Sequence, residues 1–198
     1  MFIGVAGIAG SGKDSFVNAL INEFSTIGVK AKRYSLGDNL KKEIAPIIIQ
    51  EKGFDPLDCS REQKELIRPI LVSYAKQKRE ATKGRYWIEK LERSIEDDAD
   101  KPDIYCISDI RYAEFDRDEF HWLKNEKSGV LVHISKFFKE DGRVVPQKPP
   151  NEEEAKNDPI LNENADYRIF WEHGDKYIYK YPVQFIDWAI RANRLSRS

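Results

Sequence analysis

The sequence contains few of the residues that mark disulfide scaffolds, metal clusters or membrane spans. Its 198 residues include two cysteines, Cys59 and Cys106, which lie far apart without metal-ligand spacing, so we expect free thiols. The three histidines show no ligand or catalytic-triad spacing. No apolar run approaches the roughly 18 residues of a transmembrane helix. The N-terminal apolar run also lacks the basic segment that precedes the apolar run of a signal peptide. We therefore expect a cytoplasmic protein that does not enter a membrane.

Neither sign of charge is in excess. The chain has 33 basic and 34 acidic residues, which leaves a formal net charge of -1. No overall field therefore favours nucleic acid, and we do not expect a nucleic-acid partner. Hydrophobic residues make up 40% of the chain and include four Trp and ten Phe, enough to fill the core of one domain. We predict a single domain over residues 1–198.

The most informative stretch is FIGVAGIAGSGKDSFVNAL, residues 2–20. It predicts a buried strand, a glycine-rich turn and the start of a helix. Gly7, Gly10 and Gly12 allow positive φ angles and close backbone approach, so that successive N–H groups can converge on phosphate oxygens. The helix N-terminus adds its partial positive charge. Lys13 completes the spacing G-x-x-x-x-G-K and would reach the phosphates of a nucleotide.

The residue after the lysine departs from the usual phosphate-binding motif. Ser or Thr is expected there, but this chain has Asp14, with a hydroxyl one place later at Ser15. Such an arrangement is a feature of small-metabolite kinases. The alternative is a glycine-rich turn that binds no ligand. The loop residues that we expect to bind the nucleotide are Gly7, Gly10, Ser11, Gly12, Lys13, Asp14 and Ser15.

Strand patterns alternate with helix patterns along the chain, which predicts an α/β fold. We expect a P-loop kinase-type, three-layer sandwich with a central, mostly parallel sheet. Residues 53–100 predict a helical region that would bind the second substrate. Residues 136–165 are rich in Lys, Glu, Pro and Asn, and their prolines should bar regular structure. We expect a mobile flap or lid there.

A second acidic position follows the short apolar strand predicted over residues 103–108. Asp109 stands at its carboxyl end, where open α/β sheets place their ligands. Together with Lys13 it would form the two halves of a phosphoryl-transfer site. Asp109 and Ser15 are the residues that we expect to hold Mg²⁺, since hard cations prefer oxygen ligands. The alternative for Asp109 is an ordinary helix cap or turn residue.

Transfer of a phosphoryl group between nucleotides requires arginines from outside the loop. Arg111 lies two residues beyond Asp109, on the same side of the strand, whereas Arg68 and Arg79 lie in the helical region and could equally be solvated. Trp87 could stack on a base, although core packing is the more common role for such a residue. Glu114, after Arg111, could accept a hydrogen bond from a sugar or base, or lie free on the surface.

The sequence resembles the deoxynucleoside monophosphate kinases of tailed bacteriophages, a branch of the P-loop kinases. The similar segments occur in order along most of the chain: GIAGSGKDS, RYSL, IRPILVSYAKQKR followed by RYW, ISDIRYAE, PPNEEE and NADYRIFWEHG. Family members often carry Gly-Thr-Glu where this chain has Ala75, Lys76 and Gln77, and they carry a His-x-Ser-Glu pattern that its late segment lacks. Glu114 also lies about one residue closer to Arg111 than in the family.

The resemblance implies a kinase that uses ATP and Mg²⁺ to phosphorylate a deoxynucleoside monophosphate, in the host cytoplasm if the protein is viral. It implies that Lys13 binds the donor phosphates, that Asp14 and Ser15 act near the metal or the transferred group, and that Asp109 belongs to the metal or acceptor site. The residues implied to be catalytic are Lys13, Asp14, Arg79, Asp109 and Arg111. The residues implied to bind the acceptor are Arg68, Arg79, Trp87, Asp109, Arg111 and Glu114. A kinase acting on a hydroxyl group of a modified base in DNA or on another metabolite, and a nucleotide-binding protein without turnover, are the alternatives. A homodimer remains open.

Overall fold

The computed structural model describes residues 1–175 and 179–195. Its centre is a sheet in the order β2-β3-β1-β4, with β6 paired to the free side of β4. Strands β1 (Phe2–Ala6), β2 (Ala31–Tyr34), β3 (Ile104–Ile110), β4 (Val130–Glu140) and β6 (Tyr167–Glu172) are parallel to their neighbours, and the short β5 (Arg143–Pro146) pairs antiparallel with the end of β4. The α/β class and the mostly parallel sheet predicted from the sequence are therefore confirmed.

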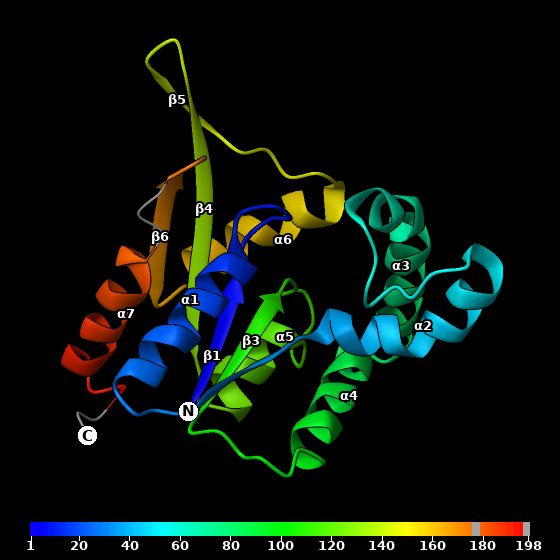
Figure 1. The fold of residues 1–198 in the computed structure, drawn as a ribbon, viewed down its shortest axis with the longest axis horizontal. Helices are drawn as coiled ribbons and strands as arrows, with labels where there is room; N and C mark the ends of the chain where they lie inside the picture. Colours follow the sequence, from blue (N-terminus) through cyan, green and yellow to red (C-terminus); the bar gives the residue numbers. More distant parts are fainter. Residues whose placement is uncertain (176–178, 196–198) are drawn as a thin grey trace.

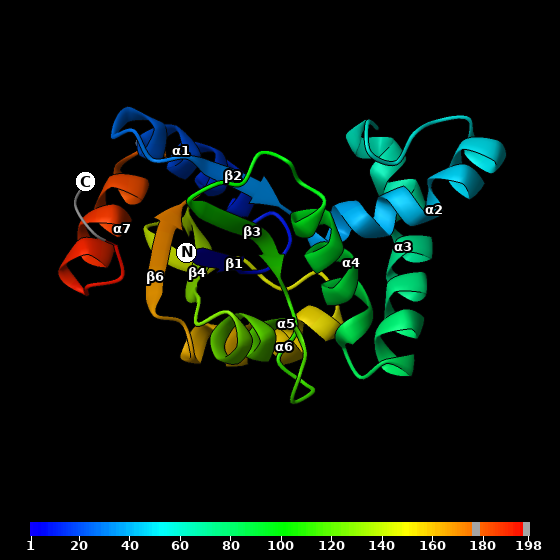
Figure 2. The same ribbon diagram turned by 90° about the horizontal axis from the view of Figure 1, so that it is seen from below.

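Helices cover both faces of the sheet (Figure 2). On one face, α1 (Lys13–Thr26) and α7 (Lys180–Arg191) pack through aromatic side chains that include Phe16, Phe24 and Phe185. On the other face lie α5 (Glu119–His121), a π-helical turn (Trp122–Glu126) and α6 (Glu152–Glu163). Trp122, Leu123 and Leu161 fill that second core. No helix in the described ranges has the length and hydropathy to cross a lipid bilayer.

Three helices form a lobe beside the sheet (Figure 1). They are α2 (Leu36–Lys52), α3 (Arg61–Ala81) and α4 (Arg85–Glu96). A small apolar cluster of Ile44, Ile48, Ile67 and Leu71 joins α2 to α3. Ser60 begins α3 with a capping box, in which its hydroxyl accepts from the Gln63 N–H. The helices predicted between residues 53 and 100 are present.

The expectation that prolines bar regular structure over residues 136–165 is wrong. The segment forms the β4–β5 hairpin and helix α6, which continues through Pro159. A proline costs an isolated helix roughly 3 kcal/mol. Here tertiary contacts offset that cost, because Leu161 is buried against the sheet and Asn157 Oδ1 accepts from the Ala113 N–H at 3.2 Å. Pro46 and Pro69 likewise lie inside α2 and α3 without ending them.

The glycine-rich loop is fastened to the far edge of the sheet by Trp171 of β6. The Trp171 indole donates to Ser11 O at 2.8 Å, and its ring lies directly beneath Gly12. A Cβ atom built on Gly12 would approach Trp171 Cζ2 to 2.1 Å, and Gly12 has a φ of 99°. Glycine is therefore required there for both space and backbone conformation.

Replacing Gly12 by Ala tests this packing. Gly28→Ala is the matched control, because Gly28 also has positive φ (74°) but has no atom within 4 Å of a built Cβ. The free energy of unfolding of both variants should fall by about 1–2 kcal/mol, because alanine is strained in the left-handed backbone conformation. Gly12→Ala should lose about 1–3 kcal/mol more from overpacking against Trp171. Equal losses in urea-induced unfolding would contradict this account of the loop.

Candidate functional site

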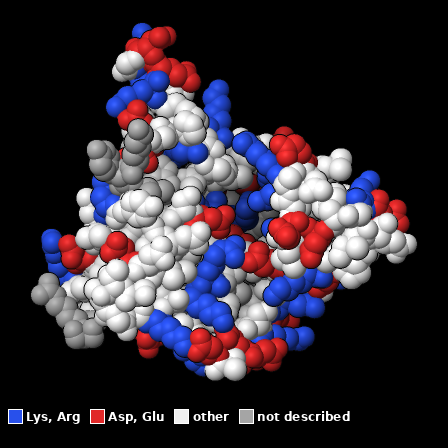
Figure 3. All heavy atoms as spheres, in the orientation of Figure 1, with Lys and Arg blue, Asp and Glu red and all other residues white. Residues whose placement is uncertain are grey.

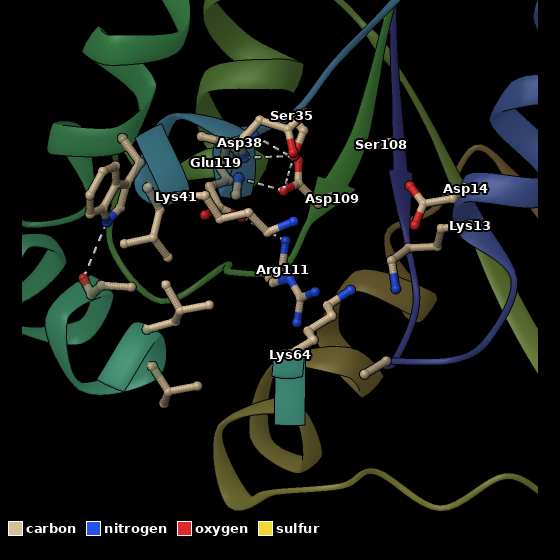
Figure 4. A pocket seen from close by; sticks show the side chains of 18 of the residues that line it. Lys13, Asp14, Ser35, Asp38, Lys41, Lys64, Ser108, Asp109, Arg111 and Glu119 are labelled. Atoms are coloured by element: carbon tan, nitrogen blue, oxygen red, sulfur yellow. Dashed lines mark hydrogen bonds between the residues drawn. The ribbon is translucent and has the colours of Figure 1, made fainter. Parts of the chain in front are cut away.

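A cavity of about 510 Å³ lies between the glycine-rich loop, the carboxyl end of β3 and the helical lobe. Figure 4 shows its side chains converging from these separate elements. The predicted site residues that line it are Gly10, Gly12, Lys13, Asp14, Ser15, Arg68, Trp87, Asp109 and Arg111. Six basic side chains and four acidic ones line the cavity, although the chain as a whole has a net charge of -1. Its lining is therefore suited to an anionic ligand.

Asp109 connects the sheet to the helical lobe. Its Oδ1 accepts from the Leu36 N–H at 2.9 Å, and its Oδ2 accepts from the Gly37 N–H at 2.7 Å and the Ser35 hydroxyl at 2.8 Å. These donors belong to the first turn of α2, whose N–H groups have no partner within the helix. The capping alternative for Asp109 thus describes its contacts here, while the residue also lines the cavity.

Lys13 is buried and folded back on the loop. Its ammonium donates to Gly7 O at 2.6 Å and Ile8 O at 2.9 Å. Burial, followed by the nearby charge of Arg111, lowers the pKa of Lys13 to about 8. Gly7 itself has no room for a side chain, because a Cβ there would lie 2.3 Å from Ile134 O. An anion bound in the loop would favour the charged form of the ammonium and so offset the effect of burial on its pKa.

Arg111 is held from behind by a buried carboxyl group that the sequence analysis missed. Glu119 Oε2 accepts from the backbone N–H groups of Arg111 at 2.6 Å and Tyr112 at 3.2 Å. Burial raises the pKa of Glu119 to about 8. The guanidinium of Arg111 is thereby presented to the cavity from a fixed backbone (Figure 4).

Two further lysines, also missed from the sequence, extend into the cavity toward Arg111. They are Lys41 of α2 and Lys64 of α3 (Figure 4). Neither makes an ion pair within the described part of the chain, whereas Arg68 is held by Glu65 at 2.6 and 2.8 Å. Helical spacing could have found Lys64, because it begins the stripe 64, 68, 71, 75 of α3, all of which lines the cavity.

The far wall of the cavity is apolar. Leu40, Leu71, Val72 and Ala75 line it together with Trp87. The Trp87 indole is buried and donates to Ala75 O at 3.2 Å, so its polar atom is already satisfied. Trp87 therefore serves the core and the cavity wall at once, and this wall offers packing surface to a ligand.

Two predicted residues lie outside the cavity lining and pair with one another. Arg79 Nη2 donates to Glu114 Oε2 at 2.9 Å, and the Arg79 side chain is only 4% exposed. The guanidinium stacks on Tyr112, 3.9 Å from the ring centre. Its Nε and Nη1 atoms are buried, with no hydrogen-bond partner in the described part of the chain. Arg79 and Glu114 therefore pair with one another and do not line the cavity.

Asp14 lies at the start of α1 with its side chain 72% exposed. Arg33, a cavity residue that the sequence analysis missed, bridges Asp14 at 3.6 Å and Asp38 at 2.7 Å. The two remaining loop residues, Gly7 and Ser11, are buried and do not line the cavity, and the Ser11 hydroxyl has no hydrogen-bond partner among the described residues.

The residues present fit a magnesium–nucleotide complex. The described residues contain no group of three or more His, Cys, Asp or Glu side chains that could hold a metal. Mg²⁺ in kinase sites, however, is bound by one or two carboxylates together with substrate phosphates. Asp109 and the Ser15 hydroxyl line the same cavity and offer such oxygen ligands.

No protein-family model matches the chain, and no curated protein matches it in sequence. Among solved structures, a shikimate kinase from Aquifex aeolicus is similar, with 14% identity, a TM-score of 0.47 and 99% of both chains covered. A dephospho-CoA kinase from Campylobacter jejuni has 15% identity and a TM-score of 0.43 over 97% of this chain and 98% of that one. At these values the comparisons say nothing about what this chain binds.

Glu119 generates a pH dependence that can be measured. Its pKa in the folded protein lies above the ordinary value of 4.5, so its contribution to stability is present at acid pH and is lost as the pH rises from 4.5 through about 8. Glu119→Gln keeps an acceptor for both N–H groups but cannot ionise. We expect the free energy of unfolding in urea of the variant, minus that of the native chain, to increase by at least about 1 kcal/mol when the pH is raised from 5 to 8.5.

The matched control is Glu152→Gln, since Glu152 is exposed on α6. It should follow the native chain at every pH. A constant difference between Glu119→Gln and the native chain across this range would show that Glu119 does not titrate as its burial requires.

Proposed function

We propose that this protein transfers the γ-phosphoryl group of ATP to the 5′-phosphate of a deoxynucleoside monophosphate. The observation that carries the proposal is the continuous cavity, which runs from the glycine-rich loop past Arg111 to an apolar wall at Trp87. A phosphate-binding loop suits the donor, a cation cluster suits two phosphate groups in contact, and an apolar wall suits a base. The ordered sequence resemblance supports the same reaction.

On the donor side, the loop from Gly7 to Ser15 would hold the triphosphate through backbone N–H groups and the Lys13 ammonium. Ser15 and Asp109 would hold Mg²⁺, which when bound neutralises phosphate charge. Asp14, through Arg33, would position the first turn of α1 against α2. Lys13 must leave the Gly7 and Ile8 carbonyl groups to reach a phosphate.

On the acceptor side, Lys41, Lys64 and Arg111 would surround the monophosphate, and Trp87 with its apolar neighbours would hold the base. Arg68 lies on the same stripe of α3 and could add a contact after release from Glu65. Arg79 and Glu114 would support the site indirectly, through Tyr112, because they lie off the cavity lining.

Catalysis would consist of positioning and charge stabilisation. An acceptor phosphate is already a nucleophile and needs little help from a base. The enzyme therefore has to bring two polyanions together and stabilise their charge as the phosphoryl group passes between them. Lys13, after β1, and Arg111, after the neighbouring β3, would do this from adjacent positions in the cavity.

A coupled assay that follows ADP formation from ATP and each deoxynucleoside monophosphate tests the proposal. At least one monophosphate should be converted to its diphosphate. Lys13→Ala should lower kcat/KM by about 100-fold or more, because it removes a charge that stabilises the transferred group. Lys52→Ala, at the exposed end of α2, is the control and should change nothing.

In the same assay the double variant Lys41→Gln, Lys64→Gln should raise KM for the acceptor by about tenfold or more while KM for ATP stays the same. No consumption of any monophosphate, or full activity of Lys13→Ala, would disprove the proposed reaction. Turnover of a deoxynucleoside or another hydroxyl compound in place of the monophosphates would indicate a different acceptor class.

A further inference from the structure

Glu154 of α6 reaches across to the glycine-rich loop. Its Oε2 accepts from the Ala9 N–H at 2.6 Å, and its Oε1 accepts from Arg111 Nη1 at 3.0 Å. The Glu154 side chain is only 11% exposed. One carboxylate thus joins a backbone N–H of the loop to the guanidinium that lies opposite it. We call these two contacts the Glu154 latch.

The latch is held by ordered structure on both sides. Asn151 caps α6, and its Oδ1 accepts from the Glu154 N–H at 2.8 Å. Gln147, just before the helix, donates from Nε2 to Ala9 O at 2.7 Å. Both polar groups of Ala9 are therefore bound, the carbonyl group by Gln147 before α6 and the N–H by Glu154 in the first turn of α6. Figure 1 shows the start of α6 lying between the loop and α3.

The contacts of Glu154 are those that a phosphate group would make. Loop N–H groups and arginine guanidinium groups are the usual partners of phosphoryl oxygens. The next carboxylate of α6 acts on the helical lobe in the same way: Glu153 binds Lys76 at 2.8 Å and lies 3.8 Å from Arg79. The first turn of α6 therefore binds a backbone N–H of the loop, the guanidinium of Arg111 and cationic side chains of α3.

The state of Lys13 is consistent with a loop that is already occupied. Its ammonium donates to two loop carbonyl groups instead of pointing into the cavity centre. A carboxylate and a phosphate cannot share the Ala9 N–H and Arg111, because like charges at that distance repel strongly.

We propose that Glu154 is an internal competitor for the nucleotide phosphates. In the nucleotide-free protein its carboxylate occupies the anion position between Ala9 and Arg111, and a bound polyphosphate displaces it and releases α6 from the loop. The proposal rests on the proposed function only in that the loop binds a polyphosphate. The latch lowers the apparent nucleotide affinity by the cost of opening it and couples nucleotide binding to movement of α6.

Binding of inorganic tripolyphosphate, measured by isothermal titration calorimetry, tests the latch without any phosphoryl transfer. Glu154→Gln keeps an acceptor for the Ala9 N–H but removes the negative charge. It should bind tripolyphosphate on the order of tenfold more tightly than the native chain. Glu152→Gln removes the same charge from the same helical turn, where Glu152 is exposed, and should bind like the native chain.

Hydrogen exchange gives a second readout. On addition of tripolyphosphate to the native chain, backbone amides of residues 152–163 should exchange faster, while those of α7 should not change. Weaker binding by Glu154→Gln would mean that Glu154 positions Arg111 for the ligand, and would overturn the latch. Affinity equal to that of the native chain, or absence of binding by both, would overturn it as well.

These outcomes are separable from the proposed reaction. Tighter binding by Glu154→Gln without conversion of any monophosphate would support the latch and disprove the kinase. If a monophosphate is converted, and if the native chain, Glu154→Gln and Glu152→Gln bind tripolyphosphate with equal affinity, the kinase is supported and the latch is disproved.

Discussion

The carboxylate of Asp109 is the contact on which the arrangement of the cavity depends. It accepts three hydrogen bonds from the start of α2, and it stands at the end of β3, which pairs with β1. Because β1 leads directly into the glycine-rich loop, this side chain connects the start of the helical lobe to the strand beside the loop. The cavity is the space between them. Loss of the contact would remove three hydrogen bonds between α2 and β3, while Leu36 would still pack with Ile107 and Ile110.

The side chains around the cavity are more positive than the chain as a whole. A protein with a net charge of -1 gathers Lys13, Lys41, Lys64 and Arg111 around one cavity. Over the face drawn in Figure 3, acidic and basic side chains are interspersed, so no stripe of one sign is present there to track a nucleic-acid strand. The positive charge is therefore local to the cavity. The Glu154 latch would balance part of that charge until an anionic ligand arrives.

The sequence predicted the parts of the molecule that local pattern determines. The loop, the helix from residue 13 to 26 and Asp109 at a strand end follow from glycine spacing and apolar periodicity. It did not predict partners distant in the chain: Lys41 and Lys64 face Arg111 only after three helices pack, and Arg79 finds Glu114 across 35 residues. The prediction that prolines bar regular structure over residues 136–165 was wrong for the same reason, because tertiary contacts of α6 outweigh the free-energy cost of Pro159 in a helix.

The central claim is that one cavity receives both nucleotides with their phosphates in contact. A crystal structure with adenosine and a deoxynucleoside joined by a pentaphosphate tests it most directly. The account predicts that the phosphate chain runs from the loop at Lys13 past Arg111 to Lys41 and Lys64, with the deoxynucleoside against Trp87. A deoxynucleoside bound outside the cavity, or a phosphate chain that avoids the glycine-rich loop, would contradict it.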